Sequence, residues 1–168
     1  MIKVRVGVIG LGSIFHRVMK GFDRAENCEL YAVAARDTAR AQAEAEKYGA
    51  KRAFGSYEEL AACPEVDLVY VATPHNFHRE QTLMCIEHGK HVICEKAFAM
   101  NGDEAREMAA AARDKGVFLM EAMWTRSLPA MRRLRRSTVA SGLSDMHCVS
   151  FISVTVRTLS ASIPSNSG

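Results

Sequence analysis

The sequence lacks several features that would place the protein in a membrane or in an oxidising compartment. No apolar run approaches the roughly 20 residues that a helix needs to cross a bilayer. Glycines and an arginine interrupt the apolar N-terminal stretch, and no small-residue cleavage site follows it. The five cysteines are odd in number and form no C-x-x-C pair, which indicates reduced thiols. We therefore expect a soluble, cytoplasmic protein with no membrane partner.

An excess of charge of one sign is also lacking. The formal net charge is +3 at pH 7, and a content of 24% charged and 48% hydrophobic residues is ordinary for a globular domain. The one basic cluster, Arg132 to Arg136, has no interleaved aromatic residues, and its Leu134 fits an apolar helix face. We interpret this cluster as a solvated helix face and expect no nucleic-acid partner.

The motifs of several enzyme classes are missing as well. The sequence contains no G-x-S-x-G nucleophile elbow, no Walker lysine and no catalytic cysteine signature. His75 with His78, and His88 with His91, form pairs that have no third ligand at a suitable spacing. We therefore expect no metal site.

The sequence does contain a regular alternation of short apolar runs and amphipathic stretches. The runs predict strands at Lys3–Ile9, Glu29–Ala34, Val66–Val71, His91–Cys94 and Val117–Met120. The stretches between them predict helices at Ser13–Asp23, Thr38–Tyr48, Ser56–Ala62, Phe77–His88 and Asp103–Lys115. Helix caps agree with these bounds, with N-caps at Asp37 and Asn101 and C′ glycines at Gly49, Gly89 and Gly116. Right-handed crossovers then predict an α/β fold with a doubly wound, Rossmann-type parallel sheet.

The alternation stops after Ala122. We predict a dinucleotide-binding domain over 1–122, and a connecting helix from Pro129 to Arg136 at the start of 123–168. The rest of 123–168 is rich in Ser, Thr and Gly and has no further helical pattern. It is expected to be the truncated start of a second α/β domain.

The stretch VGVIGLGSIFHRV, residues 6–18, is typical of a dinucleotide-binding turn between a first strand and a first helix. Gly10 permits the tight turn, and Gly12 lets the backbone approach a pyrophosphate at the helix N-terminus. The third glycine position of the motif holds Phe15, where a small residue is expected. The predicted contacts are Gly10, Leu11, Gly12, Ser13, Ile14 and Phe15. A merely structural glycine turn is the alternative.

The end of the second strand bears on the choice of cofactor. The position of the acidic residue that would bind the ribose of NAD is occupied by Ala35, and Arg36 follows it. Because guanidinium pairs well with phosphate, we predict NADP as the first choice and NAD as the second. The alternative makes Arg36 a solvated loop residue and Asp37 a simple helix cap.

Two polar loops follow neighbouring strands at their carboxyl ends, where open α/β sheets bind ligands. We expect Thr73, Pro74, His75, His78, Glu95 and Lys96 to converge there beside the cofactor. Lys96 is the predicted catalytic residue, because its ammonium group can stabilise charge on a substrate oxygen or relay a proton. A surface Glu-Lys pair is the alternative.

Together these motifs resemble the glucose–fructose oxidoreductase, inositol dehydrogenase and rhizopine-catabolism (Gfo/Idh/MocA) family from about Lys3 to Ser150. EAMWTRSLP (Glu121–Pro129) resembles its dihydrodiol dehydrogenase branch. The resemblance implies an N-terminal Rossmann domain that binds NADP or NAD and transfers hydride to or from a sugar, polyol or dihydrodiol. It also implies that Lys96 contacts substrate and nicotinamide, and that Trp124 and Arg126 line the nicotinamide end.

Two positions depart from the family pattern. Ala97 replaces the proline of the family's Glu-Lys-Pro motif, which often follows a cis bond. A non-proline cis bond costs about 2.5–4 kcal/mol, so we expect Lys96 to be placed differently. His75 replaces the asparagine of the family's Pro-Asn-x-x-His loop.

The resemblance also implies a second domain that completes the substrate site, which we do not find in the sequence. We therefore expect the cofactor-binding half of an oxidoreductase, inactive alone and prone to form homo-oligomers. Codons ATT TCG GTT ACC GTA CGG for 152–157, preceded by one restored G, would encode Asp-Phe-Gly-Tyr-Arg-Thr, which resembles the start of that domain. A frameshift in the tail 152–168 is thus a hypothesis. A non-enzymatic nucleotide-sensing or interaction module and a Rossmann methyltransferase are the alternatives for function.

Overall fold

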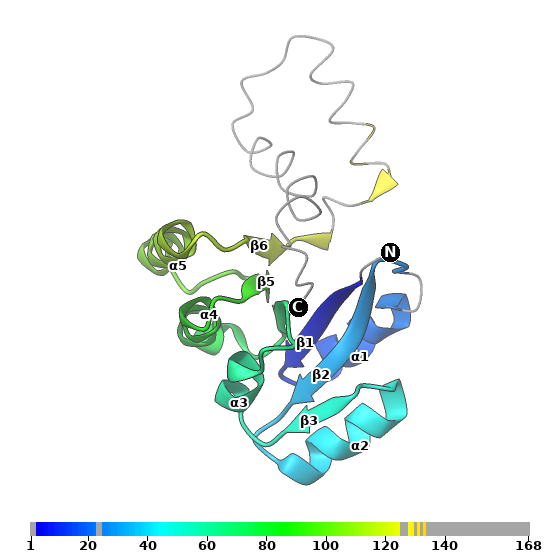
Figure 1. The fold of residues 1–168 in the computed structure, drawn as a ribbon. Coiled ribbons are helices and arrows are strands. Elements are labelled where there is room, and N and C mark those ends of the chain that lie inside the picture. Colours follow the sequence, from blue (N-terminus) through cyan, green and yellow to red (C-terminus); the bar gives the residue numbers. More distant parts are fainter. Residues whose placement is uncertain (1–2, 23–24, 125–127, 130, 132, 134–168) are drawn as a thin grey trace. The chain divides into compact units, whose positions relative to one another are not determined.

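The computed structural model describes residues 3–22, 25–124, 128, 129, 131 and 133 (Figure 1). The chain divides into two units, Met1–Ala122 and Met123–Gly168, and the sheet with its covering helices belongs to the first. The expected frameshifted tail lies outside the described residues, as do Arg126 and most of the helix expected from Pro129 to Arg136.

In the described residues, six parallel strands form one sheet in the order β3-β2-β1-β4-β5-β6. The strands are β1 Val4–Ile9, β2 Cys28–Ala34, β3 Arg52–Phe54, β4 Leu68–Val71, β5 His91–Glu95 and β6 Leu119–Ala122. The chain first builds outward from β1 to β3 and then returns to the other side of β1, so the order reverses between β1 and β4. This is the topological switch point at which doubly wound folds bind nucleotides, and the predicted fold class is confirmed.

Helices cover both faces of the sheet (Figure 1). They are α1 Ser13–Phe22, α2 Thr38–Tyr48, α3 Tyr57–Ala62, α4 His78–Glu87 and α5 Gly102–Lys115, with a short 3-10 helix at His75–Phe77 before α4. α1 and α2 pack on one face, and α3, α4 and α5 pack on the other.

The helix ends lie where local chemistry places them. The Asp37 carboxylate accepts hydrogen bonds from two N–H groups of the first turn of α2, and the Asn101 side chain accepts one from Glu104 at the start of α5. Gly49 and Gly116 end α2 and α5 with φ of 72° and 70°, a left-handed conformation that glycine adopts without steric cost. The predicted caps are confirmed.

One strand was not predicted, and several predicted bounds differ from the structure by one or two residues. β3 was not predicted, because a three-residue edge strand that begins at an exposed arginine is too short to show a pattern. The helix predicted over Phe77–His88 spans His78–Glu87, and the 3-10 helix at His75–Phe77 precedes it. The last strand was predicted two residues early and runs to Ala122.

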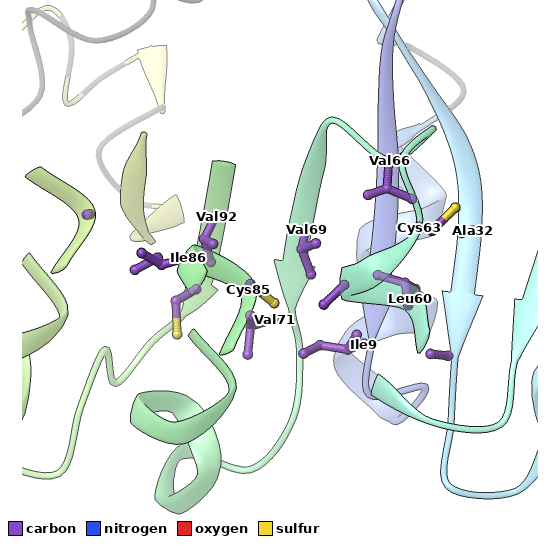
Figure 2. Close-up of a cluster of buried hydrophobic side chains, with 14 of the residues drawn as sticks. Ile9, Ala32, Leu60, Cys63, Val66, Val69, Val71, Cys85, Ile86 and Val92 are labelled. Atoms are coloured by element: carbon purple, nitrogen blue, oxygen red, sulfur yellow. The ribbon is translucent and has the colours of Figure 1, made fainter. Parts of the chain in front are cut away.

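The core consists of two apolar clusters separated by the sheet. Figure 2 shows the cluster under α3, α4 and α5, which contains Ile9, Val69, Val71 and Val92 from the strands and Leu60, Cys85 and Ile86 from the helices. On the other face, Phe15 and Met19 of α1 pack with Ala41 and Ala45 of α2. The central strands are therefore buried on both faces, as their continuous apolar runs predict.

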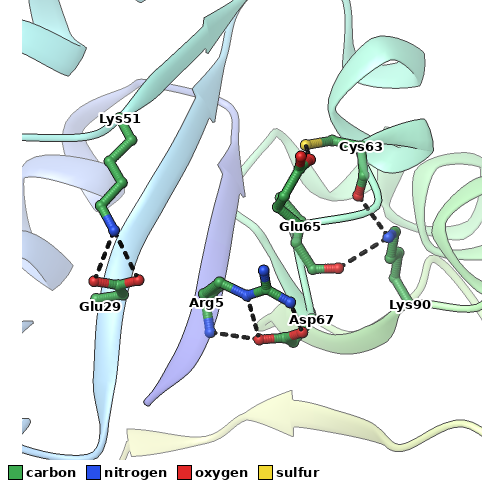
Figure 3. A network of polar contacts seen from close by, with 8 residues as sticks. Arg5, Glu29, Lys51, Cys63, Glu65, Asp67 and Lys90 are labelled. Atoms are coloured by element: carbon green, nitrogen blue, oxygen red, sulfur yellow. Dashed lines mark hydrogen bonds and ion pairs between the residues drawn. The ribbon is translucent and has the colours of Figure 1, made fainter. Parts of the chain in front are cut away.

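Polar contacts fasten the sheet at the amino ends of its strands (Figure 3). The Arg5 guanidinium donates to both oxygens of Asp67, at 3.1 and 2.9 Å, and links β1 to the start of β4. Partial burial alone would raise the pKa of Asp67, but hydrogen bonds from Arg5 bring it below its ordinary value. The buried Lys90 ammonium donates to the carbonyl oxygens of Cys63 and Val66, at 2.7 and 2.9 Å. These bonds fix the connection between α3 and β4.

Among the described residues, Cys28, Cys63, Cys85 and Cys94 are unpaired thiols. Burial raises the pKa of Cys85 and of Cys94 to about 12, so neither is a reactive thiolate at neutral pH. In the same part of the chain, no helix is long and apolar enough to cross a membrane.

The environment of His91 predicts that the stability of the fold depends on pH. Its Nδ1 accepts a hydrogen bond from the Phe118 N–H at 3.0 Å. Burial lowers the pKa of His91, and the charge of Asp67 opposes this only in part. The neutral imidazole should therefore contribute to the free energy of unfolding. We expect this contribution to be complete above about pH 6.5, the ordinary histidine pKa. It should be lost as pH falls through the lowered pKa of His91 in the folded state. Urea unfolding at pH 8 and pH 5 measures this loss.

The matched variant is His91→Gln, whose amide oxygen can accept the same hydrogen bond but does not titrate. It should lose less unfolding free energy than the wild type between pH 8 and pH 5. An equal loss in both proteins would contradict the assignment.

Candidate nucleotide-binding site

The turn between β1 and α1 touches the end of β4. Gly10 has a φ of 87°, and a Cβ atom there would lie 2.8 Å from both the carbonyl carbon of Ala72 and the nitrogen of Thr73. A side chain at Gly12, in contrast, would meet no described atom within 4 Å. Gly10 therefore brings the turn against β4, and Gly12 leaves open space above the backbone at the start of α1. A dinucleotide pyrophosphate could occupy that space next to the unpaired N–H groups of the helix.

The remaining residues of the predicted turn differ in how they can meet a ligand. Gly12 and Ser13 are exposed and Ile14 is half-buried, whereas Leu11 and Phe15 are buried in the core. The Phe15 ring packs edge-on against Tyr48, with ring centroids 5.2 Å apart. The expectation of a small residue in the third position is therefore wrong, since a full aromatic ring fits between the sheet and α2. Only main-chain groups of Leu11 and Phe15 can face a nucleotide.

Two arginines lie at the carboxyl end of β2, beside this turn. Ala35 is buried, and Arg36 is exposed and makes no hydrogen bond to a described residue. Arg40, in the first turn of α2, donates from its guanidinium to the Leu11 carbonyl oxygen. Sequence reasoning missed Arg40, although its place four residues after Arg36 at a helix start was a signal.

The loops after β4 and β5 converge, as predicted. The two ring nitrogens of His78 lie 2.9 Å from the Thr73 carbonyl oxygen and 2.8 Å from the Ala97 carbonyl oxygen. The side chain of His78 is only 1% exposed. It is thus placed to hold the two loops together, and its predicted contact with the cofactor stays a prediction. Pro74 and His75 are exposed on the same loop.

The segment that carries Lys96 is held by side chains from other elements. The peptide bond between Lys96 and Ala97 is cis, so the geometry that the resemblance associates with proline is present with alanine. The Lys96 N–H donates to Glu95 Oε2 at 3.1 Å, and the Phe98 N–H donates to Glu121 Oε1 at 3.2 Å. The Lys96 side chain is exposed and makes no hydrogen bond to a described residue.

The alternative interpretation of Glu95 and Lys96 was a surface Glu-Lys pair, but Glu95 is buried. It is 2% exposed, and its Oε1 accepts a hydrogen bond from the Tyr70 hydroxyl at 2.6 Å. Tyr70 was not singled out in the sequence, although a tyrosine within the aliphatic strand LVYV is unusual. Glu121 was also missed, because its contact depends on the register of β6.

Two predicted residues lie outside this geometry. Trp124 belongs to the second unit, where its side chain is 43% exposed, and Arg126 is not among the described residues. Within the described ranges, no group of three His, Cys, Asp or Glu side chains could hold a metal ion.

The arrangement has the features of a dinucleotide site at one edge of the sheet. The open glycine turn, the exposed Arg36 and the exposed Lys96 follow β1, β2 and β5 at their carboxyl ends. Main-chain N–H groups and guanidinium groups bind phosphates, and an ammonium group can act on a polar substrate. The residues present fit a phosphorylated dinucleotide.

Comparison with known proteins agrees with this geometry. A sequence model described as "Oxidoreductase family, NAD-binding Rossmann fold" matches residues 4–123. Trans-1,2-dihydrobenzene-1,2-diol dehydrogenase of Mus musculus is 44% identical over 146 residues, which make up 85% of this chain and 44% of that protein. The enzyme of the same name from Homo sapiens is 42% identical over 146 residues, which make up 85% of this chain and 43% of that protein.

Solved structures show the same similarity. An NAD binding oxidoreductase from Klebsiella pneumoniae superposes with a TM-score of 0.77 at 36% identity, over 83% of this chain and 39% of that one. A 3-ketoreductase from Actinomadura kijaniata, solved with NADP, has a TM-score of 0.76 at 30% identity, over 82% of this chain and 44% of that one. The chain thus spans less than half the length of these relatives. It belongs to the Gfo/Idh/MocA oxidoreductase family, whose members carry an NAD(P)-binding Rossmann domain.

Proposed function

We propose that the chain binds NADP(H) and forms the cofactor half of an oxidoreductase that acts on a sugar, polyol or dihydrodiol. The observation that carries the proposal is the convergence of the Thr73 and Lys96 loops beside the open turn at Gly12. The names of the relatives support a hydroxyl or carbonyl carbon as the reacting group, since they include dihydrodiol dehydrogenases and a 3-ketoreductase.

The adenosine end is proposed to lie at the carboxyl end of β2. Arg36 is free to pair with a 2′-phosphate, and the buried Ala35 provides no carboxylate for an unphosphorylated ribose. Arg40 is anchored to the Leu11 carbonyl and adds a second positive charge beside the turn. Both charges favour NADP over NAD.

The nicotinamide end is proposed to lie between the Thr73 and Lys96 loops. When bound, the nicotinamide supplies or accepts hydride at its C4 atom. The exposed Lys96 ammonium would bind the substrate oxygen, stabilise negative charge on it or exchange a proton with it. The exposed His75 on the neighbouring loop is a further candidate for contact with the cofactor.

The proposal has three further parts. The chain covers 44% of a curated relative, which supports nucleotide binding without substrate turnover by these 168 residues alone. β3 and β6 are the outer strands of the described sheet, and an open edge supports self-association. The unpaired thiols support a cytoplasmic location.

Titration of the purified chain with NADPH, NADH and S-adenosylmethionine tests the proposal. Fluorescence of Trp124 follows the binding, and calorimetry provides a check that does not depend on the position of that residue. NADPH should bind more tightly than NADH, and S-adenosylmethionine should not bind. Binding of S-adenosylmethionine alone, or of no nucleotide, would refute the proposal.

The charge of Arg36 should determine the choice between the two nicotinamide cofactors. Arg36→Ala should weaken NADPH binding by about tenfold or more, because a charge-assisted hydrogen bond contributes roughly 1.5–3 kcal/mol. NADH binding should change little. Arg113→Ala removes the same charge from the exposed last turn of α5 and serves as the control. Equal losses for NADPH and NADH in the Arg36 variant would count against a 2′-phosphate contact.

The two glycines of the turn should separate folding from binding. Gly10→Ala should cost about 1–3 kcal/mol of unfolding free energy, because the residue has positive φ and lies against the β4 backbone. Gly12→Ala should leave stability unchanged and weaken NADPH binding by about tenfold or more, equivalent to at least about 1.4 kcal/mol. Thermal unfolding and NADPH titration measure the two effects.

Gly21→Ala provides the control for this pair, since Gly21 lies in α1 and a Cβ there also meets nothing within 4 Å. It should leave NADPH binding unchanged. If Gly12→Ala also binds NADPH normally, the pyrophosphate does not lie over Gly12.

A further inference from the structure

A partly buried hydrogen-bonded bridge joins β4 to the first residue beyond β5. The Tyr70 hydroxyl donates to Glu95 Oε1 at 2.6 Å, and Glu95 Oε2 accepts from the Lys96 N–H at 3.1 Å. Both carboxylate oxygens are therefore used by donors from outside the Glu95 residue. Both bonds use the carboxylate oxygens as acceptors, which is the role that a carboxylate takes.

The bridge holds the main chain in place for one residue beyond the end of β5. Tyr70 pairs in register with Ile93 on β5, and the last residue pair between β5 and β6 is Glu95 with Ala122. Lys96 is thus the first residue without a partner in the β5–β6 ladder, and the Glu95 side chain accepts its N–H instead. The main chain that carries the exposed Lys96 ammonium is fixed at the point where it leaves the sheet.

Core packing alone does not account for this pair. Parallel strands buried on both faces are usually apolar, and the neighbours of Tyr70 on β4 are leucine and valines. Removing a carboxylate and a hydroxyl from water is costly unless they are hydrogen-bonded, and an apolar pair of similar volume would avoid that cost. The specific effect of the polar pair is to set the position of the Lys96 main chain.

The next two residues are held in a similar way. The Ala97 carbonyl oxygen is bonded to His78 of α4, and the Phe98 N–H is bonded to Glu121 of β6. Three successive residues therefore each have a main-chain group bonded to a side chain. The bridge to Lys96 continues from Glu95 to a second strand, through Tyr70 of β4.

We infer that Tyr70 and Glu95 are positioning residues for the nicotinamide end of the cofactor, an inference that rests on the proposed function. They act through the Lys96 main chain and do not contact the ligand themselves. Loss of the Tyr70 hydroxyl removes its hydrogen bond to Glu95 Oε1 and loosens the Lys96 segment. The adenosine end, at the other side of the switch point, is unaffected.

The test uses Tyr70→Phe in the full chain with two ligands, NADPH and 2′-phospho-ADP-ribose, which lacks the nicotinamide. In the wild type, NADPH should bind more tightly than 2′-phospho-ADP-ribose. Tyr70→Phe should weaken the binding of NADPH by about tenfold, since a hydrogen bond to the Glu95 carboxylate is lost. The affinity for 2′-phospho-ADP-ribose should stay unchanged. Glu95→Gln should change the two affinities in the same pattern. Tyr31→Phe, which changes the half-buried tyrosine of β2, is the matched control and should bind both ligands normally.

A second measurement needs no ligand. Hydrogen exchange of the Lys96 amide should become about tenfold faster in Tyr70→Phe, while the amides of Val92 and Cys94 within β5 keep their wild-type rates. Unchanged exchange at Lys96 would overturn the bridge even if the chain binds no nucleotide. Equal weakening of both ligands, or equal wild-type affinities for both, would overturn the positioning role. Failure of the wild type to bind either ligand would refute the proposed function instead.

Discussion

The close approach of the Gly10 main chain to the end of β4 is the contact on which the site geometry depends. No room exists there for a side chain, because a Cβ would lie 2.8 Å from the Ala72 carbonyl carbon. The contact places the open backbone of Gly12 beside the Thr73 loop. That loop is bonded through His78 to the segment of Lys96. A single steric constraint thus brings three chain segments, distant in sequence, to one edge of the sheet.

The charged side chains at the two ends of the strands differ in their partners. At the amino ends, charged groups are paired or bonded to carbonyl oxygens, as Arg5 is with Asp67 and Lys90 is with Cys63 and Val66. At the carboxyl ends, Arg36 and Lys96 are exposed and make no hydrogen bond to a described residue. Charges that stabilise the fold are therefore satisfied internally, and those at the opposite edge remain available for a charged ligand.

Sequence reasoning was effective where one residue type has one physical use. Apolar runs predicted the buried central strands. Asp37 and Asn101 cap the starts of α2 and α5 as expected, and Gly116 ends α5. β3 was missed because three residues at an edge carry too little pattern. The family and the fold class were predicted correctly, whereas the contacts of the individual site residues remain predictions.

Within the site, the sequence could place residues on loops but could not assign their partners. The loop of His78 was found, yet its buried position between two carbonyl oxygens depends on how α4 packs. Tyr70 and Glu95 lie 25 residues apart, and only the pairing of β4 with β5 brings their side chains together. Such contacts follow from register, which a single sequence determines only weakly at the level of side-chain pairs.

The distribution of buried polar groups supports the view that the position of Lys96 is set before any ligand binds. Among the described residues, the buried polar side chains are His78, Gln81, Thr82, Lys90 and Glu95. His78 and Glu95 bond to the Lys96 segment, and Gln81 accepts from the Thr73 hydroxyl on the neighbouring loop. A loop at the surface could satisfy its main chain with water, without the desolvation that these buried groups require. Three of these five residues, His78, Gln81 and Glu95, are therefore buried where the two loops meet, and they fix the main chain from which the Lys96 side chain extends.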